Sequence, residues 1–201
     1  MNDPMDAPLI AFEGLDQSGK ETQAARLGEA LRAAGHRVER LTFPDYETPI
    51  SQEIAAALRG QRHYPPDVLQ LLFIANRFEF RPRIEGWVRE GAVVICDRYL
   101  ASSIAYGEAQ GLDPAWLAET QRLLPQPSLT LLLDIAPETA VRRKAAGRDR
   151  FERDLALLAR VRESYLRQAT HPSWCRLDGE RPPEAVAADI TAAVRARLGL
   201  L

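Results

Sequence analysis

Two glycines and a lysine near the N-terminus constrain this chain more than any other feature. Gly14 is followed five positions later by Gly19 and then Lys20. This is the spacing of a phosphate-binding loop (P-loop), in which backbone N–H groups surround an anion and the lysine reaches its outer phosphates. Residues 9–12 predict a buried strand before the loop, and residues 22–34 predict a helix after it, whose N-terminus favours an anion. The alternative is a glycine-rich turn that binds no ligand.

One position departs from the P-loop pattern. The residue after the lysine is usually Ser or Thr, whose hydroxyl binds Mg²⁺, whereas this chain has Glu21. Thr22 cannot replace that hydroxyl, because it is rotated by about 100° around the helix. We expect the Glu21 carboxylate to point outward, away from the phosphates; the alternative is that it reaches the metal through a water molecule.

The composition indicates a single domain spanning residues 1–201. The chain has 201 residues, 46% of them hydrophobic, enough for a single large core. Its apolar runs are short and residues 1–8 do not resemble a secretion signal, so we expect a cytoplasmic protein without a membrane partner. A net charge of −2 argues against nucleic acid as a partner. Two distant cysteines, Cys96 and Cys175, indicate neither a disulfide framework nor a metal knuckle.

Strand and helix patterns alternate along the chain. Further strands are expected at residues 37–43, 92–96, 129–135 and 174–177, and further helices at residues 50–59, 66–80, from Pro137, and at 183–198. Pro82 should kink or restart the third helix. The alternation predicts an α/β fold: a doubly wound, five-stranded parallel sheet flanked by helices, with ligands beyond the carboxyl ends of the strands.

An acid and a base follow the predicted strand at residues 92–96. Asp97 and Arg98 would lie near the phosphates, where Asp97 would hold Mg²⁺ directly or through water and Arg98 would bind the transferring phosphate oxygens. The alternative is a surface ion pair that contributes almost nothing to stability.

An arginine-rich stretch covers residues 141–153. Gly147 should end the preceding helix, so residues 147–153 can form a small lid in which Arg148 and Arg150 stabilise the charge of phosphoryl transfer. A solvated helix face is the alternative, and it is the preferred interpretation for Arg142, Lys144 and Arg153.

Taken together, these motifs resemble the thymidylate kinase family, P-loop nucleoside monophosphate kinases, over nearly the whole chain. The matching segments are Phe12-Glu13-Gly14-Leu15-Asp16 with Gly19-Lys20, Phe43-Pro44, Leu72-Phe73 with Asn76-Arg77, Asp97-Arg98-Tyr99 with Ser102-Ser103 and Tyr106, Leu124-Pro125-Gln126-Pro127, and Asp149-Arg150-Phe151-Glu152.

The resemblance implies two sets of site residues. The ATP site would comprise Gly14, Leu15, Asp16, Gln17, Ser18, Gly19, Lys20, Glu21 and Thr22, with adenine between Arg143 and the loop at Asp178-Gly179. The acceptor site would comprise Asp16 on the 3′-hydroxyl, Phe73 stacked on thymine, Arg77 on a base carbonyl, Arg98 on the phosphate, Ser102 and Ser103 at the base, and Tyr106 against the sugar 2′ position. Phe73 could equally be a core residue of its helix.

This chain departs from the family pattern after Phe43-Pro44. Many members have an arginine there, whereas this chain has Asp45 and Tyr46; Tyr46 would donate a hydrogen bond to the nucleotide instead. Family members carry their extra positive charge either in the P-loop or in the lid. Because Gln17 is neutral, this chain resembles the type with arginines in the lid.

The expected activity is therefore Mg²⁺-dependent transfer of a phosphoryl group from ATP to dTMP, in line and without a covalent intermediate, by a homodimer. Lys20, Asp97, Arg98, Arg148 and Arg150 are the expected catalytic residues and Asp97 the expected metal ligand. Two alternatives remain: a kinase for another nucleoside monophosphate or a deoxynucleoside, or a nucleotide-binding protein with impaired catalysis.

Overall fold

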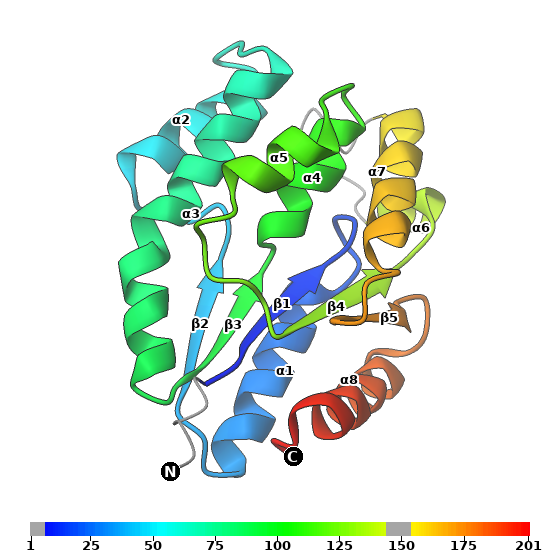
Figure 1. The fold of residues 1–201 in the computed structure, drawn as a ribbon. Helices are drawn as coiled ribbons and strands as arrows, with labels where there is room; N and C mark the ends of the chain where they lie inside the picture. Colours follow the sequence, from blue (N-terminus) through cyan, green and yellow to red (C-terminus); the bar gives the residue numbers. More distant parts are fainter. Residues whose placement is uncertain (1–6, 144–153) are drawn as a thin grey trace.

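The computed structural model describes residues 7–143 and 154–201, and a five-stranded parallel sheet lies at its centre (Figure 1). The strands are β1 (Leu9–Glu13), β2 (Val38–Thr42), β3 (Val93–Asp97), β4 (Leu129–Asp134) and β5 (Trp174–Asp178). Their order across the sheet is β2-β3-β1-β4-β5. The predicted doubly wound α/β fold is confirmed.

The register of the sheet brings two sequence motifs to one edge. Phe12 of β1 pairs with Asp97 of β3, and Glu13 pairs with Leu132 of β4. Because parallel strands end at the same edge, the loop after β1 and the turn after β3 lie side by side. The residues of β1, β3 and β4 are buried along their whole length, as expected of central parallel strands covered on both faces.

Helices lie on both faces of this sheet and beyond the carboxyl ends of its strands (Figure 1). They are α1 (Lys20–Ala33), α2 (Pro49–Leu58), α3 (Pro66–Arg89), α4 (Leu100–Glu108), α5 (Pro114–Thr120), α6 (Pro137–Arg143), α7 (Leu155–Gln168) and α8 (Pro183–Leu198). Within the described ranges, none is both long and apolar enough to cross a bilayer.

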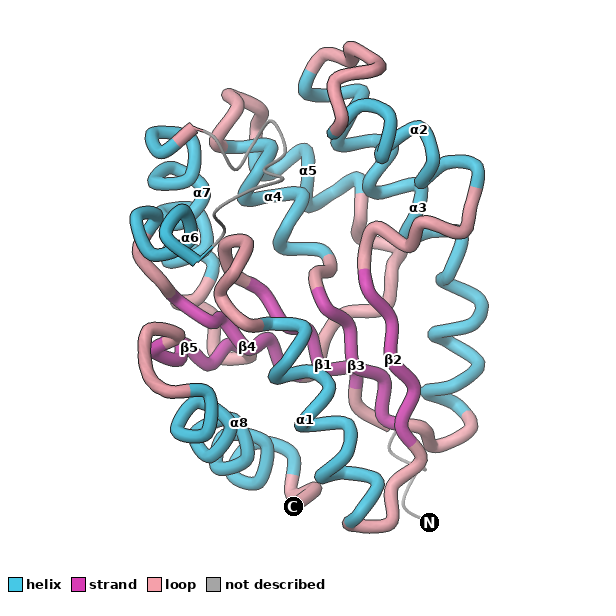
Figure 2. Tube along the Cα trace, turned by 180° about the vertical axis from the view of Figure 1, so that it is seen from behind, coloured by secondary structure: helices cyan, strands magenta, loops and turns pink. Residues whose placement is uncertain are grey.

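The two faces of the sheet have separate cores. Ile10 and Phe12 pack with residues of α1 and α8 on one face, the face nearest the viewer in Figure 2. Leu9 and Ala11 point the other way and pack with residues of α3 and of the α4 start. The alternation of β1 side chains therefore joins both layers.

The structure corrects several predicted elements. Helix α1 begins at Lys20, inside the P-loop, rather than at residue 22. Helix α3 extends to Arg89 rather than ending at residue 80, so of the two predicted effects of Pro82, the restart is wrong and a kink stays a prediction. Burial of Phe80 and Ile84 on the continuing face offsets the hydrogen bond that Pro82 removes. Helices α4, α5 and α7 are additional to the sequence prediction.

Candidate active site

The loop between β1 and α1 curls as a P-loop requires. Gly14 has φ of +140° and Gly19 φ of +93°, conformations that L side chains rarely adopt. A Cβ on Gly14 would lie 2.5 Å from the carbonyl oxygen of Leu133. Gly19 is the N-cap of α1 and provides no side-chain cap, so the first N–H groups of the helix remain available to a phosphate.

Lys20 is buried beneath this loop, with 6% of its surface exposed. Its Nζ donates to the carbonyl oxygen of Leu15 at 2.8 Å and lies 3.5 Å from Ser18 Oγ. Burial, followed by repulsion from Arg98, lowers the pKa of Lys20 from 10.5 to about 8, although Asp16 and other carboxylates partly oppose this shift. An incoming phosphate would replace the carbonyl as the partner of this ammonium group.

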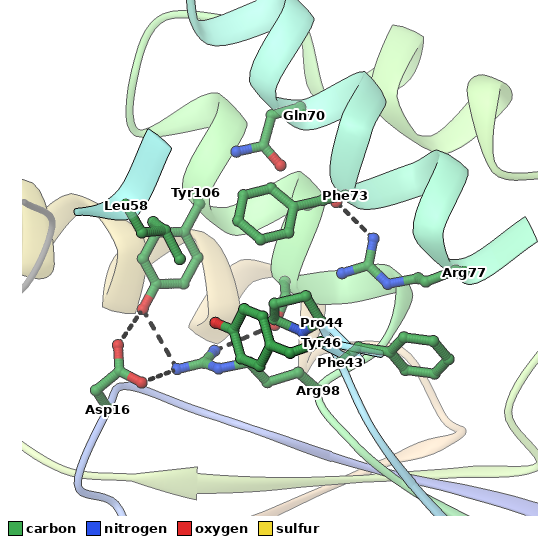
Figure 3. Close-up of a pocket in the computed structure, with 12 residues that line it drawn as sticks. Asp16, Phe43, Pro44, Tyr46, Leu58, Gln70, Phe73, Arg77, Arg98 and Tyr106 are labelled. Carbon is green, nitrogen blue, oxygen red and sulfur yellow. Dashed lines mark hydrogen bonds and ion pairs between the residues drawn. The ribbon is translucent and has the colours of Figure 1, made fainter. Parts of the chain in front are cut away.

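A pocket opens beside the P-loop, between the turn after β2, α3 and α4 (Figure 3). All eight expected acceptor-site residues line it: Asp16, Tyr46, Phe73, Arg77, Arg98, Ser102, Ser103 and Tyr106. Phe43, Pro44, Leu58 and Gln70 complete the lining. The structure therefore brings together residues from five separate segments of the chain.

An ion pair forms the charged end of the pocket. Arg98 Nη2 donates to Asp16 Oδ1 at 2.6 Å, and the Tyr106 hydroxyl donates to Asp16 Oδ2 at 3.2 Å. Burial disfavours both charges, but their mutual attraction outweighs it, so the pKa of Asp16 lies well below and that of Arg98 well above the usual value. Both groups stay ionised at neutral pH. Arg98 has φ of +63°, a strained conformation for a non-glycine residue.

The opposite side of the pocket suits a planar polar ring. Arg77 is 2% exposed, and its Nη1 donates to Ser103 Oγ at 2.7 Å and to Gln121 Oε1 at 3.4 Å. Its Nε has no hydrogen-bond partner among the described residues, and burial lowers the Arg77 pKa to about 10. The half-buried ring of Phe73 points into the pocket from the same helix (Figure 3). Phe73 therefore both packs on the core and presents an aromatic surface to the pocket.

Arg143 lies on the other side of the P-loop. Its Nη1 donates to the carbonyl oxygen of Gln17 at 3.1 Å and its Nη2 to that of Gly179 at 3.0 Å. The arginine therefore joins the P-loop to the loop after β5, the position at which the family resemblance would place adenine. Arg148 and Arg150 lie outside the described residues.

Asp97 is a candidate ligand for a divalent cation. It ends β3 with 7% of its surface exposed, and its Oδ1 is buried without a hydrogen-bond partner in the described part of the chain. One carboxylate oxygen completed by phosphate oxygens and water is a donor set that Mg²⁺ accepts. No cluster of three or more His, Cys, Asp or Glu side chains suited to a metal occurs within residues 7–143 and 154–201.

Sequence reasoning missed three polar residues at this site. Gln70, 1% exposed, has a buried Nε2 with no partner among the described residues; its polar side chain one turn before Phe73 on an apolar helix face was the available signal. Glu13 is an acid at the end of an apolar strand, the same signal that identified Asp97. Tyr165, whose hydroxyl accepts from Arg98 Nη1 at 3.4 Å, gave no local signal, because it lies on α7, far along the chain from the other site residues.

Comparison with known proteins decides the family. The model of the thymidylate kinase family matches residues 12–190. The chain belongs to the thymidylate kinase family.

Individual relatives agree with this assignment. The human thymidylate kinase is 35% identical over 185 residues, covering 90% of this chain and 87% of the human protein. The thymidylate kinase of Arabidopsis thaliana is 42% identical over 145 residues; the match covers 72% of this chain but only 55% of the plant protein. A solved structure of the thymidylate kinase from Candida albicans superposes with a TM-score of 0.86 at 29% identity, over 98% of this chain and 94% of the other.

The short distance between Gly14 and the Leu133 carbonyl predicts a loss of stability when a side chain is added at this glycine. Gly14→Ala places a Cβ against the Leu133 carbonyl, so it should lower the free energy of unfolding by more than Gly35→Ala does. Gly35 shares a positive φ of +91° but faces open space, and its substitution should cost about 1–2 kcal/mol. Urea unfolding of the two variants measures the difference; equal losses would contradict the close approach.

The lowered pKa of Lys20 predicts proton uptake when a triphosphate binds. With a pKa of about 8, about half of the amines are neutral at pH 8, and bound phosphate favours the charged form. Binding of a non-hydrolysable ATP analogue at pH 8 should therefore take up about half a proton, and its affinity should fall as pH rises through 8. Calorimetry in buffers of different ionisation enthalpy measures the uptake. In Lys20→Arg, which stays charged, this uptake should disappear; persistence would assign it to another group.

Proposed function

We propose that this protein phosphorylates dTMP to dTDP, with Mg²⁺-ATP as donor, by direct in-line transfer for dTTP synthesis. The observation that carries the proposal is the pocket that joins an aromatic face and a buried arginine to an ion pair beside a P-loop. The family to which the chain belongs and the names of its relatives support the same acceptor.

The apolar end of the pocket would bind the base. The Phe73 ring would stack on thymine, because a flat aromatic face suits a flat base. Arg77 would donate to a carbonyl oxygen of the base from a fixed position, since Ser103 and Gln121 already hold one of its nitrogens. A base that lacks the matching oxygen would leave this buried donor without a hydrogen-bond acceptor, and such a base would bind less tightly.

The charged end would bind the sugar and the phosphate. Asp16 would accept a hydrogen bond from the 3′-hydroxyl, and Tyr106, held against Asp16 at 3.2 Å, would crowd the 2′ position and favour deoxyribose. Arg98 would bind the acceptor phosphate, with Tyr46 as a further donor in place of the arginine usual in the family. Neutralising that phosphate makes its oxygen a competent nucleophile, so no covalent intermediate is required.

The donor side would rest on the P-loop. Residues 14–22 and Lys20 in particular would hold the phosphates, and adenine would lie beside Arg143 at the loop around Gly179. Arg148 and Arg150 would add positive charge to the transferring group, because Gln17 supplies none.

Asp97 would hold Mg²⁺, directly or through water. The metal would supply positive charge to the phosphate oxygens during transfer. Glu21 is exposed in the structure, which supports an outward orientation in which it leaves the cation to phosphates, water and Asp97.

We further propose that the protein works as a cytoplasmic homodimer and that its partners are ATP and dTMP rather than nucleic acid or membrane. The family resemblance supports the dimer, and the net charge of −2 supports small-molecule partners.

Turnover assays with Mg²⁺-ATP and five acceptors test the proposal: dTMP, dUMP, dCMP, dGMP and thymidine. The highest kcat/KM should be that for dTMP. Preference for another monophosphate or for thymidine would support the alternative kinases, and absence of turnover with all five would support a nucleotide-binding protein without catalysis.

The acceptor site predicts selective changes in KM. Phe73→Ala and Arg77→Ala should each raise the KM for dTMP roughly 10- to 100-fold, the range expected for a base-stacking or charged hydrogen-bond contact, and should change the KM for ATP little. Val68→Ala, at an exposed position of the same helix, is the control. If the KM for ATP rises most, the acceptor site is misplaced.

The lid predicts a change in kcat. The double variant Arg148→Ala/Arg150→Ala should lose about 10³–10⁵ in kcat, the contribution of transition-state arginines in other phosphoryl-transfer enzymes, with little change in nucleotide affinity. Arg142→Ala is the control, because Arg142 bonds to Thr139 within α6. If the double variant keeps most of its kcat, the two arginines belong to a solvated charge cluster and do not stabilise the transition state.

A further inference from the structure

A buried carboxylate lies beneath the acceptor pocket without a role in the chemistry described above. Glu13 is the last residue of β1 and is fully buried. Four neutral donors from three other residues, distant in sequence, point at its two oxygens: two backbone N–H groups and two hydroxyls. Burying a carboxylate is unfavourable unless it accepts hydrogen bonds. The arrangement of these four donors indicates the role of Glu13.

Oxygen Oε1 of Glu13 caps helix α4. It accepts from the backbone N–H of Tyr99 at 2.8 Å and from that of Ser102 at 3.3 Å. Tyr99 is the N-cap of α4 and offers no side-chain cap of its own, so Glu13 supplies one from the neighbouring strand, where its negative charge also suits the helix dipole. This fixes the turn directly after Arg98, whose φ of +63° needs such support.

Oxygen Oε2 of Glu13 orders two hydroxyl groups. It accepts from Ser102 Oγ at 2.7 Å and from the Tyr165 hydroxyl at 3.0 Å, and the two hydroxyls are 2.9 Å apart. Each hydroxyl has one proton to donate. With both protons directed to Glu13, the lone pairs of the two hydroxyl oxygens can face a donor on the pocket side.

That donor is Arg98. Its Nη1 donates to Ser102 Oγ at 3.2 Å and to the Tyr165 hydroxyl at 3.4 Å, while its Nη2 donates to Asp16 at 2.6 Å. The guanidinium is therefore held from two sides, by Asp16 directly and by Glu13 through the two hydroxyls. A guanidinium that is already fixed in position loses less conformational entropy when its ligand binds.

We propose that Glu13 is a positioning residue that holds Arg98, through Ser102 and Tyr165, in the orientation that receives the acceptor phosphate. This inference rests on the proposed role of Arg98 in the acceptor site. Helix α7 is then part of the acceptor site as well, because it carries Tyr165.

Steady-state kinetics of Glu13→Gln, Tyr165→Phe and the double variant test this role. Gln keeps the size of Glu but replaces one acceptor oxygen with an NH₂ group, which cannot accept from the hydroxyls. Glu13→Gln should raise the KM for dTMP roughly 10- to 100-fold, the value of a hydrogen bond to a charged group, and change the KM for ATP less than about twofold. Tyr165→Phe should act in the same direction. The double variant should be no worse than Glu13→Gln, because both act through one network.

Asp134→Asn is the matched control. Asp134 is a buried carboxylate at the end of the adjacent strand β4, but it binds Arg162 and Arg176, away from the acceptor pocket. This variant should lower the melting temperature without raising the KM for dTMP.

A merely structural role would lower the melting temperature of Glu13→Gln and leave the ratio of the two KM values unchanged, and this result would overturn the proposal. The proposal would also be overturned if the double variant raised the KM for dTMP by the product of the two single-variant increases, because the two residues would then act independently. If Glu13→Gln does not fold, Tyr165→Phe decides alone, and an unchanged KM for dTMP refutes the role. Arg98→Lys separates this inference from the proposed function. If this variant leaves the KM for dTMP unchanged, Arg98 does not bind the acceptor and the proposed function is wrong at this residue. If it raises that KM while Glu13→Gln and Tyr165→Phe do not, Arg98 binds the acceptor but Glu13 does not position it.

Discussion

The ion pair between Asp16 and Arg98 joins the two loops on which the site depends. Asp16 belongs to the P-loop after β1, and Arg98 to the turn after β3; their side chains meet at 2.6 Å. The pairing of Phe12 with Asp97 places these two loops next to each other before any side chain is considered. The sheet register thus brings two charges together, and the pair in turn fixes the P-loop relative to the pocket.

Much of this arrangement could be predicted from the sequence, and particular residues show why. Residues 92–96 form an unbroken apolar, β-branched run, so their burial in a central parallel strand follows from composition alone. The spacing of Gly14, Gly19 and Lys20 likewise specifies a local loop. In both cases the information lies within a few neighbouring residues.

The contacts that hold Arg98 from below could not be predicted, because they join residues that are distant in the sequence. The bonds from Ser102 and Tyr165 to Glu13 join residues separated by 89 and 152 positions, which no local pattern records. Continuation of α3 through Pro82 is also a tertiary effect, because burial of Phe80 and Ile84 outweighs a local preference. The helix containing Tyr165 was not predicted, so its hydroxyl could not be placed in the site.

The balance of charge explains why the proposed reaction needs additional cations. Side chains of opposite charge lie near one another at this site: the cations are Lys20, Arg77 and Arg98, and the anions are Glu13, Asp16 and Asp97. Each of these charges has an opposite charge or hydrogen-bond donors nearby, which offsets the free-energy cost of burying it. Two phosphate-bearing nucleotides would add several negative charges in a region of low dielectric, where uncompensated charge is costly. In the proposed reaction, a divalent cation held by Asp97 and the guanidinium groups of Arg148 and Arg150 would supply this additional positive charge, because buried groups that are already paired with one another cannot neutralise it.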